Sequence, residues 1–131
     1  IANALLIDEV MKFNIATAPR KMGTFSQYQY PHTLERYVEC ANFVGVCGKD
    51  DMDTFNKFLE KIDALKAEVK IPKTIKEWFE MKPDGVTEEE FLGKLDNMVE
   101  QAFDDQCTGA NPRYPLMSEL KEMYLNAYYG R

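Results

Sequence analysis

The chain has 131 residues, of which 45% are hydrophobic and 29% charged, and its formal net charge at pH 7 is −6. This length and composition predict one globular domain, and the negative charge argues against nucleic acid or an anionic membrane as a partner. No apolar run approaches the ~20 residues of a membrane span and no signal peptide is evident, so we expect a cytoplasmic protein.

The cysteines and the histidine argue against a structural metal or disulfide framework. Cys40, Cys47 and Cys107 form neither an even set nor a C-x-x-C pair, and we expect free thiols. His32 is the single histidine, whereas metal sites need several convergent ligands. We therefore interpret His32 as a surface residue at a helix entry, next to Pro31.

The first predicted helix runs from about residue 2 to residue 15 and carries apolar groups nearly all round, so it needs a neighbour on every side. A truncated domain cannot provide all of these neighbours, and we expect part of the helix to be exposed in this chain. This helix has no Ser, Thr, Asp or Asn cap and the chain does not open on Met, which indicates a fragment of a longer protein. The aromatic-rich residues 17–31 are predicted to form a loop packed on the body.

The second predicted helix begins at Thr33 and ends at Gly45 or Gly48, because glycine favours a helix stop. The third has Asp50 or Asp51 as its N-cap. Its apolar residues recur at helical spacing: Met52, Phe55, Phe58, Leu59, Ile62, Leu65 and Val69.

Two further helices each open with a predicted capping box, in which a threonine bonds the N3 amide and a glutamate reaches back. Thr74 with Glu77 opens a short helix, and Thr87 with Glu90 opens the clearest helix in the chain. The apolar face of that helix is Phe91, Leu92, Leu95, Met98, Val99, Ala102 and Phe103. The acidic runs at residues 50–53 and 88–90 resemble divalent-ion ligands, but we interpret them as helix N-terminal charges that suit the dipole.

A last helix from Pro115 is predicted to bury Leu116, Leu120, Met123, Tyr124 and Ala127. No alternating strand pattern of any length is present. The predicted fold class is all-α, a bundle of about six helices within one domain, residues 1–131.

The stretch 104–113 between the last two helices is predicted to be a rigid corner. Gly109 suits a left-handed helix stop, and a helix does not simply continue through Pro112. Asp104 and Asp105 are unfavourable at a helix C-terminus, so we expect them to pair with a cation, and Arg113 is the nearest candidate.

The same corner carries a family resemblance. The run D-D-x-C-T-G-x-N-P-R at 104–113 resembles the C-terminal part of the iron-containing alcohol dehydrogenases, and more narrowly that of the bifunctional aldehyde-alcohol dehydrogenases. An H-G-x-A-N-A-like motif of the family matches Ile1–Ala4 in its last four positions. Further matches are Phe25–Tyr28, Arg36–Tyr37, Ile71–Lys73, Tyr114–Lys121 and Tyr128–Arg131.

The resemblance implies a helical C-terminal domain beside a nucleotide-binding α/β domain. It implies Fe²⁺ held by one Asp and three His, the last of them two residues before the position of Ile1, and NAD contacts further upstream. It also implies hydride transfer between the nicotinamide and a carbonyl carbon, a small alcohol or aldehyde substrate, and a homo-oligomer. Accordingly we assign no catalytic, cofactor-binding or metal-binding residue within the chain.

Cys107 has two interpretations. It is either a small buried hydrophobe at a helix end, or, as the resemblance implies, a residue of the substrate pocket close to the metal and nicotinamide. Asn3 also has two interpretations: a hydrogen bond at the start of the helix, which we favour, or contact with the substrate.

The predicted function is therefore the C-terminal helical part of an Fe- and NAD-dependent alcohol dehydrogenase that interconverts short aldehydes and primary alcohols, with acetaldehyde and ethanol foremost. The fragment alone is expected to be inactive without the remainder of its chain. The alternative is a non-enzymatic all-α interaction or assembly module.

Overall fold

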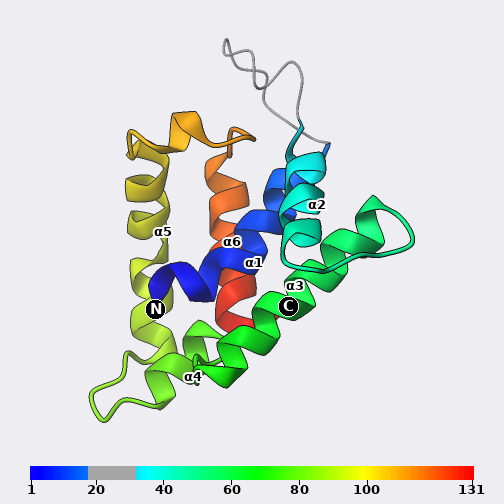
Figure 1. The fold of residues 1–131 in the computed structure, drawn as a ribbon. Helices are drawn as coiled ribbons and strands as arrows, with labels where there is room; N and C mark the ends of the chain where they lie inside the picture. The colour runs from blue at the N-terminus through cyan, green and yellow to red at the C-terminus, as the bar shows by residue number, and fades with distance from the viewer. Residues whose placement is uncertain (18–31) are drawn as a thin grey trace.

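The computed structural model describes residues 1–17 and 32–131 (Figure 1). In these ranges it contains no strand, and the prediction of an all-α fold is confirmed. The loop predicted for 17–31 and the motif Phe25–Tyr28 fall almost entirely outside the described residues. Within the described part no helix is both long and apolar enough to cross a bilayer.

The helices are α1 (Ala2–Ile15), α2 (Thr33–Phe43), α3 (Asp51–Glu68), α4 (Ile75–Glu80), α5 (Glu88–Asp104) and α6 (Met117–Tyr129), with a short 3-10 helix, η2 (Thr108–Ala110), between the last two.

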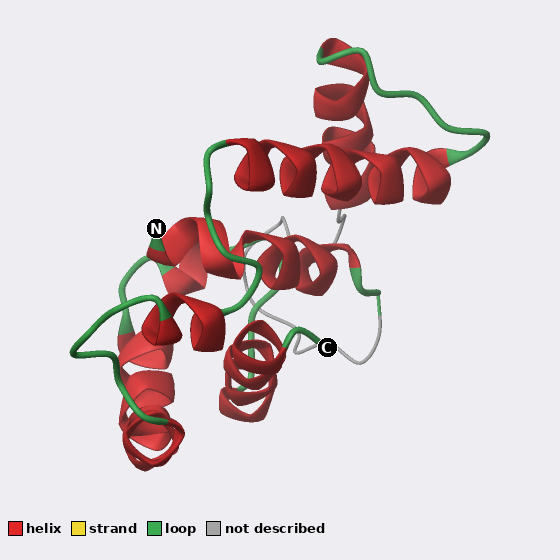
Figure 2. Ribbon diagram, turned by 90° about the horizontal axis from the view of Figure 1, so that it is seen from below, coloured by secondary structure: helices red, strands yellow, loops and turns green. Residues whose placement is uncertain are grey.

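The helices form two packed groups that share α1. In Figure 2, α2 and α3 cross each other on one side of the molecule, and the other helices lie on the opposite side. The larger apolar cluster joins α1, α4, α5 and α6 through Leu5, Ile75, Phe91, Leu95, Val99, Ala127 and Tyr128. The smaller joins α1 to α3 through Met11, Phe55 and Leu59, with α2 packed against it.

The shared helix α1 is only partly buried. Its range matches the prediction, but only Leu5, Met11 and Asn14 are fully buried. Ile1 is 54% exposed, and Val10 is 37% exposed. This exposure agrees with the expectation for a truncated domain, because the described helices that pack most against α1 are α6 and α2 and they leave part of its apolar surface uncovered.

An aromatic stack forms the centre of the larger cluster. The rings of Phe91 on α5 and Tyr128 on α6 lie 4.2 Å apart at 15°, and both residues are buried. The sequence pattern predicted that Phe91 is buried but did not predict the burial of Tyr128. It also predicted burial of Leu116, which is 43% exposed at the N-cap of α6. In α3 the predicted stripe is also too wide, since Leu65 is 58% exposed.

A buried ammonium ties the two groups together. Lys66 of α3 is 7% exposed and pairs with Asp8 of α1 and, at 2.6 Å, with Asp63. Burial raises the pKa of Asp8, and the attraction of Lys66 offsets only part of this effect. For Lys66, burial acts to lower the pKa, but the bonds to the two carboxylates outweigh it and raise the pKa above its ordinary value. No sequence pattern indicated this pairing.

The predicted helix caps are largely confirmed. Asp50 caps α3 by accepting from the Asp53 amide at 2.8 Å. Thr87 and Glu90 form the complete reciprocal box at α5. At α4 the box is half formed, because Glu77 donates its amide to the Thr74 hydroxyl but its carboxylate accepts from the Lys73 amide instead.

The α5 cap predicts a pH dependence. The amide and the hydroxyl of Thr87 each donate to the Glu90 carboxylate at 2.8 Å, and these hydrogen bonds lower the pKa of Glu90 below its ordinary 4.5. A carboxyl with a lowered folded-state pKa contributes stability that is present above its unfolded value and is lost as pH falls through the folded pKa. Glu90→Gln should therefore reduce stability at pH 7 and flatten its decline below pH ~4.5.

Urea unfolding of the wild type and Glu90→Gln at several pH values from 7 to 3 measures this effect. Glu89→Gln removes the same charge from the same turn without altering the cap, so it is the matched control. Equal acid slopes for Glu90→Gln and Glu89→Gln would contradict a specific role for the cap.

Candidate functional site

The corner between α5 and α6 is held by local hydrogen bonds. The Cys107 amide donates to the Asp105 carboxylate at 2.7 Å, and the Thr108 hydroxyl donates to the Ala102 carbonyl at 2.6 Å. The second bond satisfies a carbonyl that the end of α5 leaves without a helical partner. The chain thus folds back on α5 through side chains of the corner itself.

Gly109 does not have the predicted left-handed conformation. It lies in η2, and the described glycines with positive φ are Gly45 and Gly130. The prediction was wrong because the Thr108 hydroxyl and a 3-10 turn close the end of α5, and so no left-handed residue is needed.

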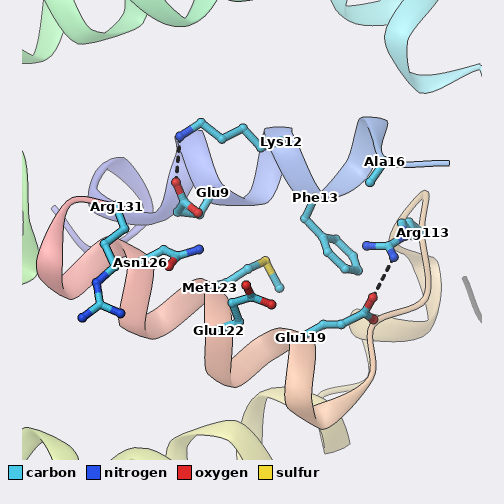
Figure 3. Close-up of a pocket in the computed structure, with 10 residues that line it drawn as sticks. All are labelled: Glu9, Lys12, Phe13, Ala16, Arg113, Glu119, Glu122, Met123, Asn126 and Arg131. Carbon is cyan, nitrogen blue, oxygen red and sulfur yellow. Dashed lines mark hydrogen bonds and ion pairs between the residues drawn. The ribbon is translucent and has the colours of Figure 1, made fainter. Parts of the chain in front are cut away.

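The ion pair predicted for Arg113 also has a different partner. Arg113 is buried and pairs with Glu119 of α6 at 2.6 Å, not with Asp104 or Asp105 (Figure 3). Its guanidinium lies 4.0 Å from the centroid of the Phe13 ring of α1. The second oxygen of Glu119 accepts from the Leu116 amide at 2.8 Å, so the charge of Arg113 fixes the start of α6.

A cavity of about 470 Å³ lies where α1, the corner and α6 meet. Among the described residues that line it there is no Asp, Glu, Lys, Arg or His. A cavity of this size with apolar, amide, hydroxyl and thiol groups suits a small uncharged molecule. Its lining residues are Asn3, Val10, Phe13, Cys107, Thr108, Asn111, Pro115, Leu120 and Met123.

The cavity brings together both pocket candidates of the sequence. Cys107 is exposed in this chain and lines the cavity, so within the chain it is not a buried residue at a helix end. Asn3 lines the same cavity from α1, and the N-cap of that helix is Ile1, without a side-chain hydrogen bond. Among the described residues, no side-chain cap bond supports the favoured helix-start role of Asn3. Val10, Asn111 and Met123 were missed, because nothing in sequence spacing brings α1, the corner and α6 together.

A second cavity, of about 430 Å³, adjoins the first and shares Phe13 and Met123 with it (Figure 3). It is charged, in contrast to the first. Lys12 pairs with Glu9 at 2.8 Å in its wall, and Arg113 pairs with Glu119. The first cavity, whose described lining carries no charged side chain, is the better candidate site for a small uncharged molecule.

A metal centre is not assembled by the described residues. Over residues 1–17 and 32–131, no three His, Cys, Asp or Glu side chains are grouped so that they could hold an ion. His32 is exposed at the start of α2 and bonds Glu35 at 3.0 Å, as its surface interpretation predicts. The acidic runs supply the caps at Asp50 and Glu90. The residues present thus do not fit an iron ion, and no catalytic step through iron follows from them.

Comparison with known proteins agrees with the corner motif. Residues 1–128 match the family described as the Fe-containing alcohol dehydrogenase family, C-terminal. The chain is 47% identical over 133 residues to the bifunctional aldehyde-alcohol dehydrogenase AdhE of Escherichia coli (strain K12), covering 100% of this chain and 14% of that protein. It is 47% identical over 128 residues to an aldehyde-alcohol dehydrogenase of Clostridium acetobutylicum, covering 98% of this chain and 14% of the relative.

A more distant relative points the same way. An NADPH-dependent butanol dehydrogenase of Clostridium saccharobutylicum is 31% identical over 129 residues, which is 98% of this chain and 28% of that protein. The chain thus spans only a small part of the length of its curated relatives. With its corner motif, its all-helical fold and a family match over almost its full length, the chain belongs to the Fe-containing alcohol dehydrogenase family, of which it represents the C-terminal part.

Proposed function

We propose that this chain is the C-terminal helical domain of a longer, cytoplasmic, Fe- and NAD-dependent alcohol dehydrogenase that interconverts short aldehydes and primary alcohols. In that enzyme it forms one wall of the substrate pocket, with Cys107 as the pocket residue. The observation that carries the proposal is the cavity of about 470 Å³ at the corner motif, which Cys107 and Asn3 both line and whose described lining carries no charged side chain.

The chain's own contribution is shape and polarity. The described walls of the cavity offer no charge to bind a carboxylate or phosphate, so they favour a neutral alcohol or aldehyde over acidic metabolites. The amide of Asn3 and the Cys107 thiol give limited polar contact, while Val10, Phe13 and Leu120 exclude water. Iron and a nicotinamide, which residues outside this chain would hold, would supply the Lewis-acid and hydride chemistry of the whole enzyme.

The remainder of the enzyme is the proposed partner. Ile1 at the N-cap of α1, and Ile7 and Val10 within α1, are each more than one-third exposed, and Val10 also lines the cavity. An exposed apolar helix face next to an open cavity suits burial against another part of the same protein. We propose that the metal- and nucleotide-binding part covers this face, and that the whole enzyme is a homo-oligomer, as in the family it resembles.

Comparison of the 131-residue chain with the full-length enzyme tests the proposal. The chain alone should neither retain stoichiometric Fe²⁺ nor oxidise NADH or NADPH with acetaldehyde, because its described residues lack a metal site. The full-length enzyme should do both, as measured by elemental analysis and by absorbance at the nicotinamide band. A refolded, metal-free full-length sample is the control.

Turnover by the chain alone, free of the whole enzyme, would overturn this division of labour. The alternative is an interaction module that docks a partner on the exposed face of α1. An inactive full-length protein that binds no iron but forms a stable complex would favour that alternative. Family membership argues for the enzyme.

A further inference from the structure

We infer that Asn14 is a positioning residue that fixes the corner against α1 and so sets the width of the uncharged cavity. Through that width it sets substrate selectivity, a role that rests on the function proposed above. Asn14 is on the last turn of α1 and is only 7% exposed. Asn14 does not line the cavity, but it accepts a hydrogen bond from Asn111, which does.

The contact is a hydrogen bond between elements far apart in sequence. The side-chain amide nitrogen of Asn111 donates to Asn14 Oδ1 at 2.7 Å and to the Arg113 carbonyl at 2.6 Å. An amide nitrogen has two hydrogens, so these bonds use both. The Asn111 side chain is therefore fixed in one orientation, with α1 on one side and the corner backbone on the other.

A weaker bond completes the arrangement on the far side of Asn14. Its Nδ2 donates to the Tyr37 hydroxyl of α2 at 3.3 Å, and the Tyr37 ring packs 5.7 Å from Phe55 in the smaller cluster. Asn14 thus connects the corner to α2 through the interior. A buried amide whose donor and acceptor are both used holds its neighbours in a fixed geometry.

The corner is consequently anchored at two points. Thr108 holds it to α5 through the Ala102 carbonyl, and Asn111 holds it to α1 through Asn14. Cys107 is adjacent to the first anchor, and the cavity lies between the corner and Asn3, Val10 and Phe13 of α1. Loss of the hydrogen bond between Asn111 and Asn14 frees the corner, which carries Cys107, from α1, which forms another wall of the cavity.

The test uses the full-length enzyme with Asn14→Ser, whose shorter side chain does not reach Asn111. A displacement of about 1 Å in an active site can change rates by up to 100-fold, so the ratio of kcat/KM for 1-hexanol to that for ethanol should change by roughly tenfold. The second readout is the rate of Cys107 alkylation by iodoacetamide, resolved by peptide mass spectrometry, which should rise severalfold and does not depend on catalysis.

Tyr37→Phe is the matched control, because it removes a hydrogen bond from Asn14 but leaves the bond to Asn111. It should lower the melting temperature while leaving both readouts at wild-type values. Asn14→Asp keeps an acceptor for Asn111 and should restore both readouts towards wild type. If Asn14→Ser does not fold, Asn111→Ser removes the same bond from the cavity side and must raise the alkylation rate.

A folded Asn14→Ser enzyme with unchanged ratio and unchanged alkylation overturns the inference, as does a Tyr37→Phe enzyme that changes both equally. If Asn14→Ser raises the alkylation rate of Cys107 but leaves the ratio of kcat/KM for 1-hexanol to that for ethanol unchanged, the role of Asn14 in selectivity is overturned. In that case Cys107→Gly identifies the cause. If it also leaves the ratio unchanged, the proposed pocket has failed; if it shifts the ratio, only the role of Asn14 has failed.

Discussion

Replacement of Cys107 by glycine in the full-length enzyme should raise kcat/KM for long or branched primary alcohols relative to ethanol by roughly tenfold or more. Cys107 is exposed at the cavity, so the change enlarges the space available to the substrate. One methylene of pocket volume is typically worth about 1–3 kcal/mol of discrimination. Steady-state kinetics with ethanol, 1-butanol and 1-hexanol measure the shift.

Cys47→Gly is the control, since Cys47 is an exposed thiol in the connection between α2 and α3 and does not line the cavity. It should leave the ratio unchanged. A Cys107→Gly enzyme with an unchanged ratio and a lowered melting temperature would assign Cys107 to packing alone, since glycine also adds backbone entropy to the unfolded chain.

Replacement of Phe91 by alanine should cost the chain about 3–5 kcal/mol of unfolding free energy. Phe91 is 3% exposed and stacks on Tyr128 at 4.2 Å, so the change opens a cavity between α5 and α6. The cost is a large share of the ~5–15 kcal/mol by which domains are stable. Equilibrium urea unfolding followed by far-UV circular dichroism measures the cost.

Leu92→Ala provides the comparison, because Leu92 neighbours Phe91 on α5 but is 42% exposed. It should cost about 1 kcal/mol or less, as is usual for a substitution at a partly exposed surface position. Similar losses for Phe91→Ala and Leu92→Ala would mean that the stack is not the centre of the core.

Local rules predicted the helices well. The caps at Asp50, Thr87 and Thr74 place three helix starts correctly, and these signals act within one turn of the chain. A cap needs only residues three positions apart, so its geometry follows from the sequence. The corner motif is likewise a run of neighbouring residues, and the family resemblance that it carries is confirmed by the family match over residues 1–128.

Burial and pairing between distant segments were predicted less well. The apolar pattern of α1 showed that a truncated domain would leave part of the helix uncovered, but not that α1 shares its contacts between two clusters with Ile1 and Val10 exposed. Arg113 had nearby carboxylates in sequence at Asp104 and Asp105, yet it pairs with Glu119, which the start of α6 places beside it. The nearest opposite charge in the chain is not the nearest in space once a corner has formed.

For this protein, the sequence by itself determined the helical class, most helix starts and the family, and the family resemblance made Cys107 a pocket candidate. Only the tertiary structure decided that Cys107 and Asn3 face one uncharged cavity and that Asn14 holds Asn111 across 97 residues. The physical reason is range: caps and periodicity are satisfied by neighbours along the chain, whereas cavity walls and buried amide bonds depend on how packed helices cross.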